Sequence, residues 1–543
     1  MNPTIKSSAP WPSARVASAK LLAPPLTARQ RLLLPLGVVL FNGLFWQERG
    51  GLNMLVFTVF IVVAQLVQLP KHAAVRRSGY FWLAVFGSLL GGTMMAVYGS
   101  AVAALACWVS VLLLLGYVNQ PPLRLVLFAG LTGLRSGAGA WLRVLRAVRA
   151  PRHAGAGVRR GWFYGRLLLV PLVILGAFHG LFAVANPVYA RLSGRALALL
   201  GDWLLWLLPD VSLGHLLFLA LGFTATAAVV VAVPVFYFAD QESQLGEFIR
   251  RQRDRVASLA VRRPDFRLKT TRALDLRKEY LAALAVFGLV NALLLVVNAI
   301  DVRWLWFGFR PAPGFNLTQF VHEGTWVLIL SILLAMGIVL WFFRRNLNFY
   351  QPGLRGLRLG ATAWVLQNAV LAVSVGLRNY YYIRQCGVAY KRIGVCFFLL
   401  LVFFGLGTVL LKIWQRRSAY SLVRLNALAV YAVLLLLAAG NWEVWMARYN
   451  LQPRFRSIDV GFLLDMPARV LPTVLARRAA LDHATQLTVE GEYGIPQVLK
   501  PADAQRLLDF ALADARAHYA AYQHWQGLTW ADWQTAQQLR GHE

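Results

Sequence analysis

The sequence predicts an all-α integral membrane protein with about eleven transmembrane helices (roughly 10–12) and a small helical C-terminal region. Of its 543 residues, 58% are hydrophobic and 14% are charged, and the mean hydropathy is +0.55. A soluble domain is about half apolar and about a quarter charged. The apolar residues form runs of roughly 17–25, which is the length of a membrane-spanning helix. The strands of a membrane barrel are about half as long and alternate in polarity, so the runs predict helices.

The predicted spans follow one another with basic segments between them. They are 31–46, 52–69, 80–98, 101–118, 166–186, 211–238, 280–300, 325–343, 361–377, 393–412 and 425–442. The run 122–134 is too short for a span, so it could be re-entrant or interfacial.

These spans divide the chain into seven parts. They are a disordered tail 1–30, a first group of spans 31–134, a basic amphipathic loop 135–165, a pair of spans 166–238, a charged loop 239–279, a core of spans 280–445 and an extramembrane helical region 446–543. The first half of the charged loop is expected to continue the preceding span as a solvated helix. In the last part, Pro501 and the capping-box variant from Thr529 to Asp532 predict helix starts.

The charge distribution predicts an orientation. The net charge is +32, and the lysines and arginines gather in alternate loops, as the positive-inside bias requires. The N-terminus is therefore expected in the cytoplasm of a bacterial cell, with the chain in the inner membrane. The basic loops are expected to bind anionic lipid headgroups and not nucleic acid. The predicted loop 378–392 is basic although it lies on the outer side.

Polar residues at the predicted outer helix ends form the candidate site, because charge near membrane depth is costly and often functional. The members are Asp301, Arg303, His322, Glu323, Arg378, Asn379, Tyr380, Tyr390, Lys391, Arg392 and Glu443. They could line one aromatic and polar pocket. The alternative is ordinary anchoring at the interface, where polar residues and tyrosines belong.

No motif in the chain indicates a reaction. His322 and Glu323 could be metal ligands or an acid–base pair, but adjacent residues of a helix point about 100° apart. Three cysteines occur without metal-ligand spacing, and no phosphate loop or nucleophile elbow is present. The expectation is no metal and no cofactor, while an enzymatic activity stays uncertain, with its absence favoured.

Two stretches resemble a known family. They are Val321–Leu340 with Phe342–Phe349, and Leu377–Ile383 with Ala389–Val395. These stretches resemble an uncharacterised family of bacterial polytopic membrane proteins, the group of domains of unknown function numbered four-one-seven-three and four-one-five-three. The resemblance covers about residues 275–470. It implies a multi-span inner-membrane protein and gives no activity, substrate or site residue.

Three functions remain open. Many spans with intramembrane polar groups favour a transporter or a flippase-like protein that handles lipids or small solutes. The charged loops and the region 446–543 instead suit a non-catalytic sensor or assembly partner, with a protein partner at 446–543. An intramembrane transferase acting on a lipid-linked substrate is the third, with His322 or Glu323 as its base.

Overall fold

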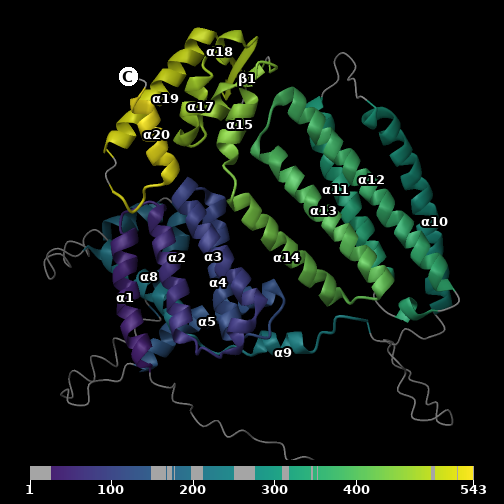
Figure 1. Ribbon diagram of the computed structural model, residues 1–543, viewed down its shortest axis with the longest axis horizontal. Coiled ribbons are helices and arrows are strands. Elements are labelled where there is room, and N and C mark those ends of the chain that lie inside the picture. The colour runs from purple at the N-terminus through teal and green to yellow at the C-terminus, as the bar shows by residue number, and fades with distance from the viewer. Residues whose placement is uncertain are drawn as a thin grey trace, which may run out of the picture. The chain divides into compact units, whose positions relative to one another are not determined.

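The computed structural model (Figure 1) separates into two compact units. The first unit comprises 1–46 and 135–233, and the second comprises 47–134 and 234–543. The structure describes residues 26–147, 167, 171, 174–176, 178–186, 188–196, 212–249, 276–307, 317–343, 346–350, 353–455, 457–490, 496–521 and 524–541. The predicted disordered tail lies almost wholly outside these residues.

The described residues contain seven helices long and apolar enough to cross a membrane. They are Gly79–Tyr98, Ala101–Asn119, Leu213–Val230, Arg277–Trp306, Leu354–Cys386, Tyr390–Gln415 and Ala419–Ala438. Shorter apolar helices include Leu52–Gln68 and Val327–Phe342. The protein is therefore a multi-pass membrane protein. The predicted count of about eleven spans is larger than the number that these helices supply.

In the first unit, α1 (Ala28–Phe45) and α8 (Leu213–Val230) run antiparallel. His215 at the start of α8 bonds Asn42 near the end of α1 at 2.7 Å. At the opposite end, the Gln30 side chain donates to the Val230 carbonyl at 3.2 Å. The predicted span 211–238 was too long, because α8 ends at Val230 ahead of Pro234, which has no backbone N–H to donate. The solvated helix expected to extend this span is also wrong, since a separate short helix, α9 (Tyr237–Ser243), follows the break.

The second unit begins with α2 (Leu52–Gln68), the 3-10 turn η1 (Ala74–Arg77), α3 (Gly79–Tyr98) and α4 (Ala101–Asn119). Small residues let these helices approach closely, as is usual between membrane helices. A Cβ added to Gly91 of α3 would lie 2.6 Å from Cys107 Cα of α4. The next helix, α5 (Val126–Ala147), begins within the short run 122–134 and continues into the predicted loop 135–165.

A second group of helices is built on one apolar core. The elements are α10 (Leu276–Asp301), the π-helical turn η3 (Val302–Trp306), α11 (Leu317–Phe342), the 3-10 turn η4 (Asn346–Phe349), α12 (Leu354–Cys386), α13 (Tyr390–Gln415) and α14 (Ala419–Ala438). Phe287, Phe343 and Trp364 are among the buried residues that join α10, α11 and α12. In Figure 1, α10 to α13 lie side by side in green. Apolar side chains such as Leu289 and Leu330 are exposed, as expected of surfaces that face lipid.

The predicted loop 378–392 is mostly helix. Helix α12 continues to Cys386 and turns at Gly387, whose φ is +77°, and α13 begins at Tyr390. The basic residues 378–384 therefore lie on the last turns of α12. This places Arg378 on a helix face, where it can pair with a neighbouring helix.

The C-terminal region packs on the ends of the helices that precede it. It follows the short helix α15 (Trp442–Asn450) and consists of β1 (Ser457–Asp459), α16 (Val460–Leu464), η6 (Ala468–Val470), α17 (Leu471–Ala476), α18 (Ala479–His483), β2 (Gln486–Glu490), β3 (Pro496–Leu499), α19 (Pro501–Ala521) and α20 (Trp530–Arg540). The predicted starts at Pro501 and Thr529 are confirmed, and Thr529 caps α20 by accepting from the Asp532 amide at 3.1 Å. The region also contains a small sheet that was not expected from its sequence. In it, β2 pairs parallel with β1 and antiparallel with β3.

The second unit has two ends that differ in what covers them. At one end, the segment 242–249 contacts the turn after α4 and the turn between α13 and α14. In the second of these contacts, the Ile249 amide donates to the Arg416 carbonyl at 2.9 Å. At the other end, the C-terminal region covers the turn between α12 and α13, where Val388 belongs to the same core as Leu463 and Leu508. We call these the loop end and the C-terminal end.

Candidate functional site

Asp301 and Arg378 form a buried ion pair between α10 and α12. The Arg378 guanidinium donates to Asp301 Oδ1 at 2.8 Å, and the two side chains are 10% and 11% exposed. The second oxygen, Asp301 Oδ2, is buried and has no hydrogen-bond partner among the described residues. A buried pair of this kind is stable only while both charges are present, since either one alone would be left uncompensated in an apolar environment.

Polar side chains continue along the same helix contact. Asn291 of α10 donates to the Gly360 carbonyl of α12 at 3.0 Å and accepts from Gln367 at 2.7 Å. Asn298 donates to the Gln367 carbonyl at 3.0 Å. Asn291 therefore joins the two helices, as polar side chains commonly do between membrane helices. The α10–α12 contact is therefore a polar seam between otherwise apolar helices.

A second group lies at the turn between α12 and α13. Asn379 is buried and donates to the Arg392 carbonyl at 3.0 Å. The Arg392 guanidinium lies 4.1 Å from the centre of the Tyr382 ring and donates to the Cys386 carbonyl at 2.8 Å. The arginine thus satisfies a carbonyl at the end of α12, where the helix dipole also favours a positive charge.

A third group joins α13, α15 and the C-terminal region. The Tyr390 hydroxyl hydrogen-bonds with Glu443. Arg469 of η6 pairs with the same carboxylate at 2.9 Å, and the side chains of Arg469 and Glu443 are only 7% and 12% exposed. Arg469 also donates to the backbone carbonyl of Tyr98 at the end of α3.

These contacts therefore place six of the predicted residues in three local groups. Asp301 pairs with Arg378, Asn379 bonds Arg392, and Tyr390 bonds Glu443. Arg303, Tyr380 and Lys391 are exposed at the surface. The side chains of His322 and Glu323 lie outside the described residues, although their backbone belongs to α11. Among the described residues, no group of three or more His, Cys, Asp or Glu side chains could hold a metal ion.

A small cavity adjoins the second group. It has a volume of about 140 Å³ and lies between the turn after α12 and the start of the C-terminal region. Arg392, Asn450 and Asp459 supply polar lining, and Cys386 and Phe462 supply apolar lining. A cavity of this size admits water or a small ion, and its lining carries both charge signs.

The loop end holds a polar group that the sequence analysis did not identify. The buried Glu242 carboxylate accepts from the Leu125 amide at 2.9 Å and the Arg124 amide at 3.1 Å, just before α5 begins, and from the Tyr420 hydroxyl. Glu247 pairs with Arg424 at 3.2 Å. Glu242 and Glu247 both line a cavity of about 440 Å³. We call Arg124, Glu242, Glu247, Tyr420 and Arg424 the Glu242 group.

Two signals in the sequence point to these missed residues. Before residue 240, the only acidic residues are Glu48, Asp202 and Asp210, so the acids at 240–247 stand out between basic loops. Arg469 is a single charge next to Val470 and Leu471, within a short apolar stretch. An arginine at such a position is buried only with a partner.

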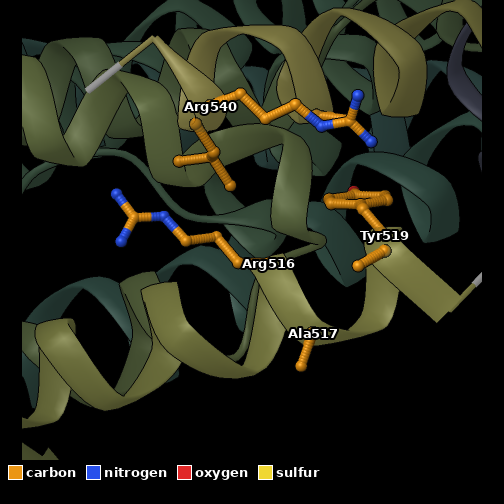
Figure 2. A pocket seen from close by; sticks show the side chains of 7 residues that line it. Arg516, Ala517, Tyr519 and Arg540 are labelled. Carbon is orange, nitrogen blue, oxygen red and sulfur yellow. The ribbon is translucent and has the colours of Figure 1, made fainter. Parts of the chain in front are cut away.

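A further hollow lies between α19 and α20. It has a volume of about 270 Å³ and is lined by Arg516, Tyr519 and Arg540. Figure 2 shows that the two arginine side chains extend in opposite directions, so their guanidinium groups do not converge on one anion. Burial raises the pKa of the Tyr519 phenol, and the nearby Asp532, which accepts from it at 3.0 Å, raises it further. The phenol therefore stays protonated and joins α19 to α20.

Comparison with known proteins gives one match. A family model described as a domain of unknown function, DUF4153, matches residues 57–475. The match confirms the predicted resemblance and extends it from about residue 275 back to residue 57. No curated protein and no solved structure matches the chain.

Proposed function

Because the chain belongs to the DUF4153 family, whose description names no activity, we propose from the geometry that it is a carrier. Its substrate would be an anionic small solute or an anionic lipid headgroup. The observation that supports this proposal is the Asp301–Arg378 pair, which lies between two membrane helices. Ionisable groups inside a membrane are expensive and usually mark the path of a substrate or an ion.

The pair suggests a simple mode of binding. Arg378 is held by one carboxylate oxygen, and an anionic substrate would compete with Asp301 for the guanidinium. Arginine suits this exchange because its planar fork binds carboxylate and phosphate groups equally well. Exposed basic residues at the same helix ends, Arg303, Arg384 and Lys391, would raise the local concentration of anions.

A flux assay tests the carrier. The purified full chain would be placed in liposomes that contain fluorescent phosphatidylglycerol. The fraction of the fluorescent lipid that an external reductant can reach would be followed over time. Uptake of radioactive phosphate into the liposomes would be measured in parallel. We expect one probe to move faster than in empty liposomes, and Arg378→Gln to remove the gain. The matched control is Arg506→Gln, a surface arginine whose side chain is 82% exposed. Movement of neither probe, or full activity in Arg378→Gln, would overturn the proposal.

The proposed orientation puts the loop end in the cytoplasm of a bacterial cell and the C-terminal end outside the inner membrane. The loop end carries Arg76, Arg124, Lys412, Arg416 and Arg424 on elements that meet there, in line with the positive-inside bias. Single cysteines at Lys71 and Arg506, in a chain whose three native cysteines are replaced by serine, test this. A reagent that cannot cross the membrane should label position 506 in intact cells and leave position 71 unlabelled. The reverse pattern would invert the protein.

A second candidate is a sensor or assembly partner that works through residues 446–543. It is favoured by one observation: the C-terminal region shares a core with the turn between α12 and α13, through Val388 and Ile393. A partner bound to this region would act directly on those helix ends. Under this hypothesis, Arg469→Gln would abolish partner-dependent activity in cells, while the flux of both probes would be no different from that in empty liposomes.

A further inference from the structure

Three tryptophans of the C-terminal region are exposed. Trp525 and Trp530 are each 54% exposed and Trp533 is 40% exposed. The rings of Trp530 and Trp533 stack with their centres 4.8 Å apart. Large aromatic side chains grouped on a surface usually mark an interface.

The segment that carries these tryptophans is bonded to the first residues of a membrane helix. The amides of Leu52 and Asn53, at the start of α2, donate to the carbonyls of Leu528 and Gln526 at 3.2 and 2.8 Å. The backbones are so close that a Cβ on Gly51 would lie 2.5 Å from the Gly527 oxygen. Figure 1 shows α20 next to the ends of α2 and α3. Trp525 and Trp530 are therefore within a few residues of the segment that is bonded to the start of the apolar helix α2.

The packing of α20 fixes which of its faces is exposed. Ala531, Thr535 and Leu539 are buried, and α20 contacts α3 as well as η6, α17 and α19. At about 100° per residue, Trp530 and Trp533 fall on the opposite side, together with the exposed Gln534. The aromatic side of α20 thus has no cover among the described residues.

We propose that this face of α20 lies in the headgroup layer of the membrane, with Trp525, Trp530 and Trp533 in contact with lipid. Tryptophan prefers this layer because its ring is apolar and its N–H still needs a polar partner. Exposed tryptophans also occur after α10 and in α15, namely Trp304, Trp306 and Trp445. The C-terminal region is then a membrane-apposed cap, and its partner at this face is the bilayer.

A fluorescent label reports on this contact. The label would be attached at Gln534→Cys in the cysteine-free full chain, because this substitution keeps all three tryptophans. The control position is Arg506→Cys on α19. The protein would be placed in phosphatidylcholine vesicles with a nitroxide on the lipid headgroup, and iodide would be used as the quencher in water.

We expect the nitroxide to quench the label at 534 several-fold more than the label at 506, and iodide to show the opposite order. Adding Trp530→Ala and Trp533→Ala should reduce the nitroxide effect at 534, with unchanged folding checked by thermal unfolding. A label at 534 that is quenched no more than the label at 506 would overturn the proposal, and a protein would then cover the face. Unchanged quenching in the double variant would show that the tryptophans do not hold the helix at the membrane.

Discussion

Arg469 pairs with Glu443 at 2.9 Å and also donates to the carbonyl of Tyr98. One guanidinium therefore connects three parts of the second unit: the C-terminal region, α15 and the end of α3. Its side chain is 7% exposed, so the charge has little access to water and depends on these partners.

Arg469→Gln should loosen the C-terminal region. Removing one member of a buried ion pair costs about 3–5 kcal/mol, because the other charge is left buried without compensation. We expect faster cleavage of the region 457–541 by a soluble protease. The control is Arg478→Gln, whose pair with Asp509 is 40% and 54% exposed and should contribute at most about 1 kcal/mol. Equal cleavage rates in the two variants would contradict the structural role of Arg469.

Asp301→Asn should destabilise the α10–α12 contact more than loss of both charges does. The single variant leaves Arg378 buried without its carboxylate, at a cost of about 3–5 kcal/mol. The double variant Asp301→Leu with Arg378→Met removes both charges and should recover much of this loss. Thermal unfolding in detergent compares the stabilities of the single and the double variant. A double variant less stable than the single variant would show that the pair itself stabilises the helices.

Gly91→Ala should separate α3 from α4. The new Cβ would lie 2.6 Å from backbone atoms of Cys107, so one helix must move. We expect a loss of about 1–3 kcal/mol, which is typical of overpacking. Gly394→Ala in α13 is the control because nothing lies within 4 Å of its new Cβ. Thermal unfolding should show that Gly91→Ala is less stable than Gly394→Ala. Equal stability of the two variants would contradict the close approach of α3 and α4.

Glu242→Gln should weaken the start of α5. The carboxylate accepts from two backbone amides and from Tyr420, and hydrogen bonds to a charged group contribute about 1.5–3 kcal/mol. Hydrogen exchange at the first turn of α5 should become faster. Asp240→Asn is the matched control, since Asp240 is exposed at the rim of the same cavity. Exchange that accelerates equally in both variants would count against the capping role.

The sequence predicted most of the membrane helices because each apolar run is a local signal. It did not predict where α12 ends, because its last turns, from Arg378 to Cys386, are polar and look like a loop. At the start of these turns Arg378 pairs with Asp301, a contact between residues 77 positions apart that the local sequence does not reveal. The break after α8 could have been predicted from Pro234.

From the sequence, the candidate site was predictable only as a set of charged and polar residues that are costly to place near a membrane interior. The sequence identified Asp301, Arg378, Asn379, Tyr390, Arg392 and Glu443, but it did not indicate which residue bonds which. Glu443 depends on Arg469, and Glu242 depends on the amides of Arg124 and Leu125. Such partners are distant in sequence and are brought together only by the packing of whole helices, so no local pattern reveals them.

The backbone contact between Gly51 and Gly527 has a consequence for biosynthesis. Residues at the start of α2 leave the ribosome long before their partners at 526–528 are made. Since chains insert and fold from the N-terminus during synthesis, the amides of Leu52 and Asn53 must wait until residues 526–528 are made before they can bond these carbonyls. The closing of this contact is therefore a late step compared with the insertion of α2. A chain truncated before residue 526 would leave the ribosome with its helices inserted and this contact still open.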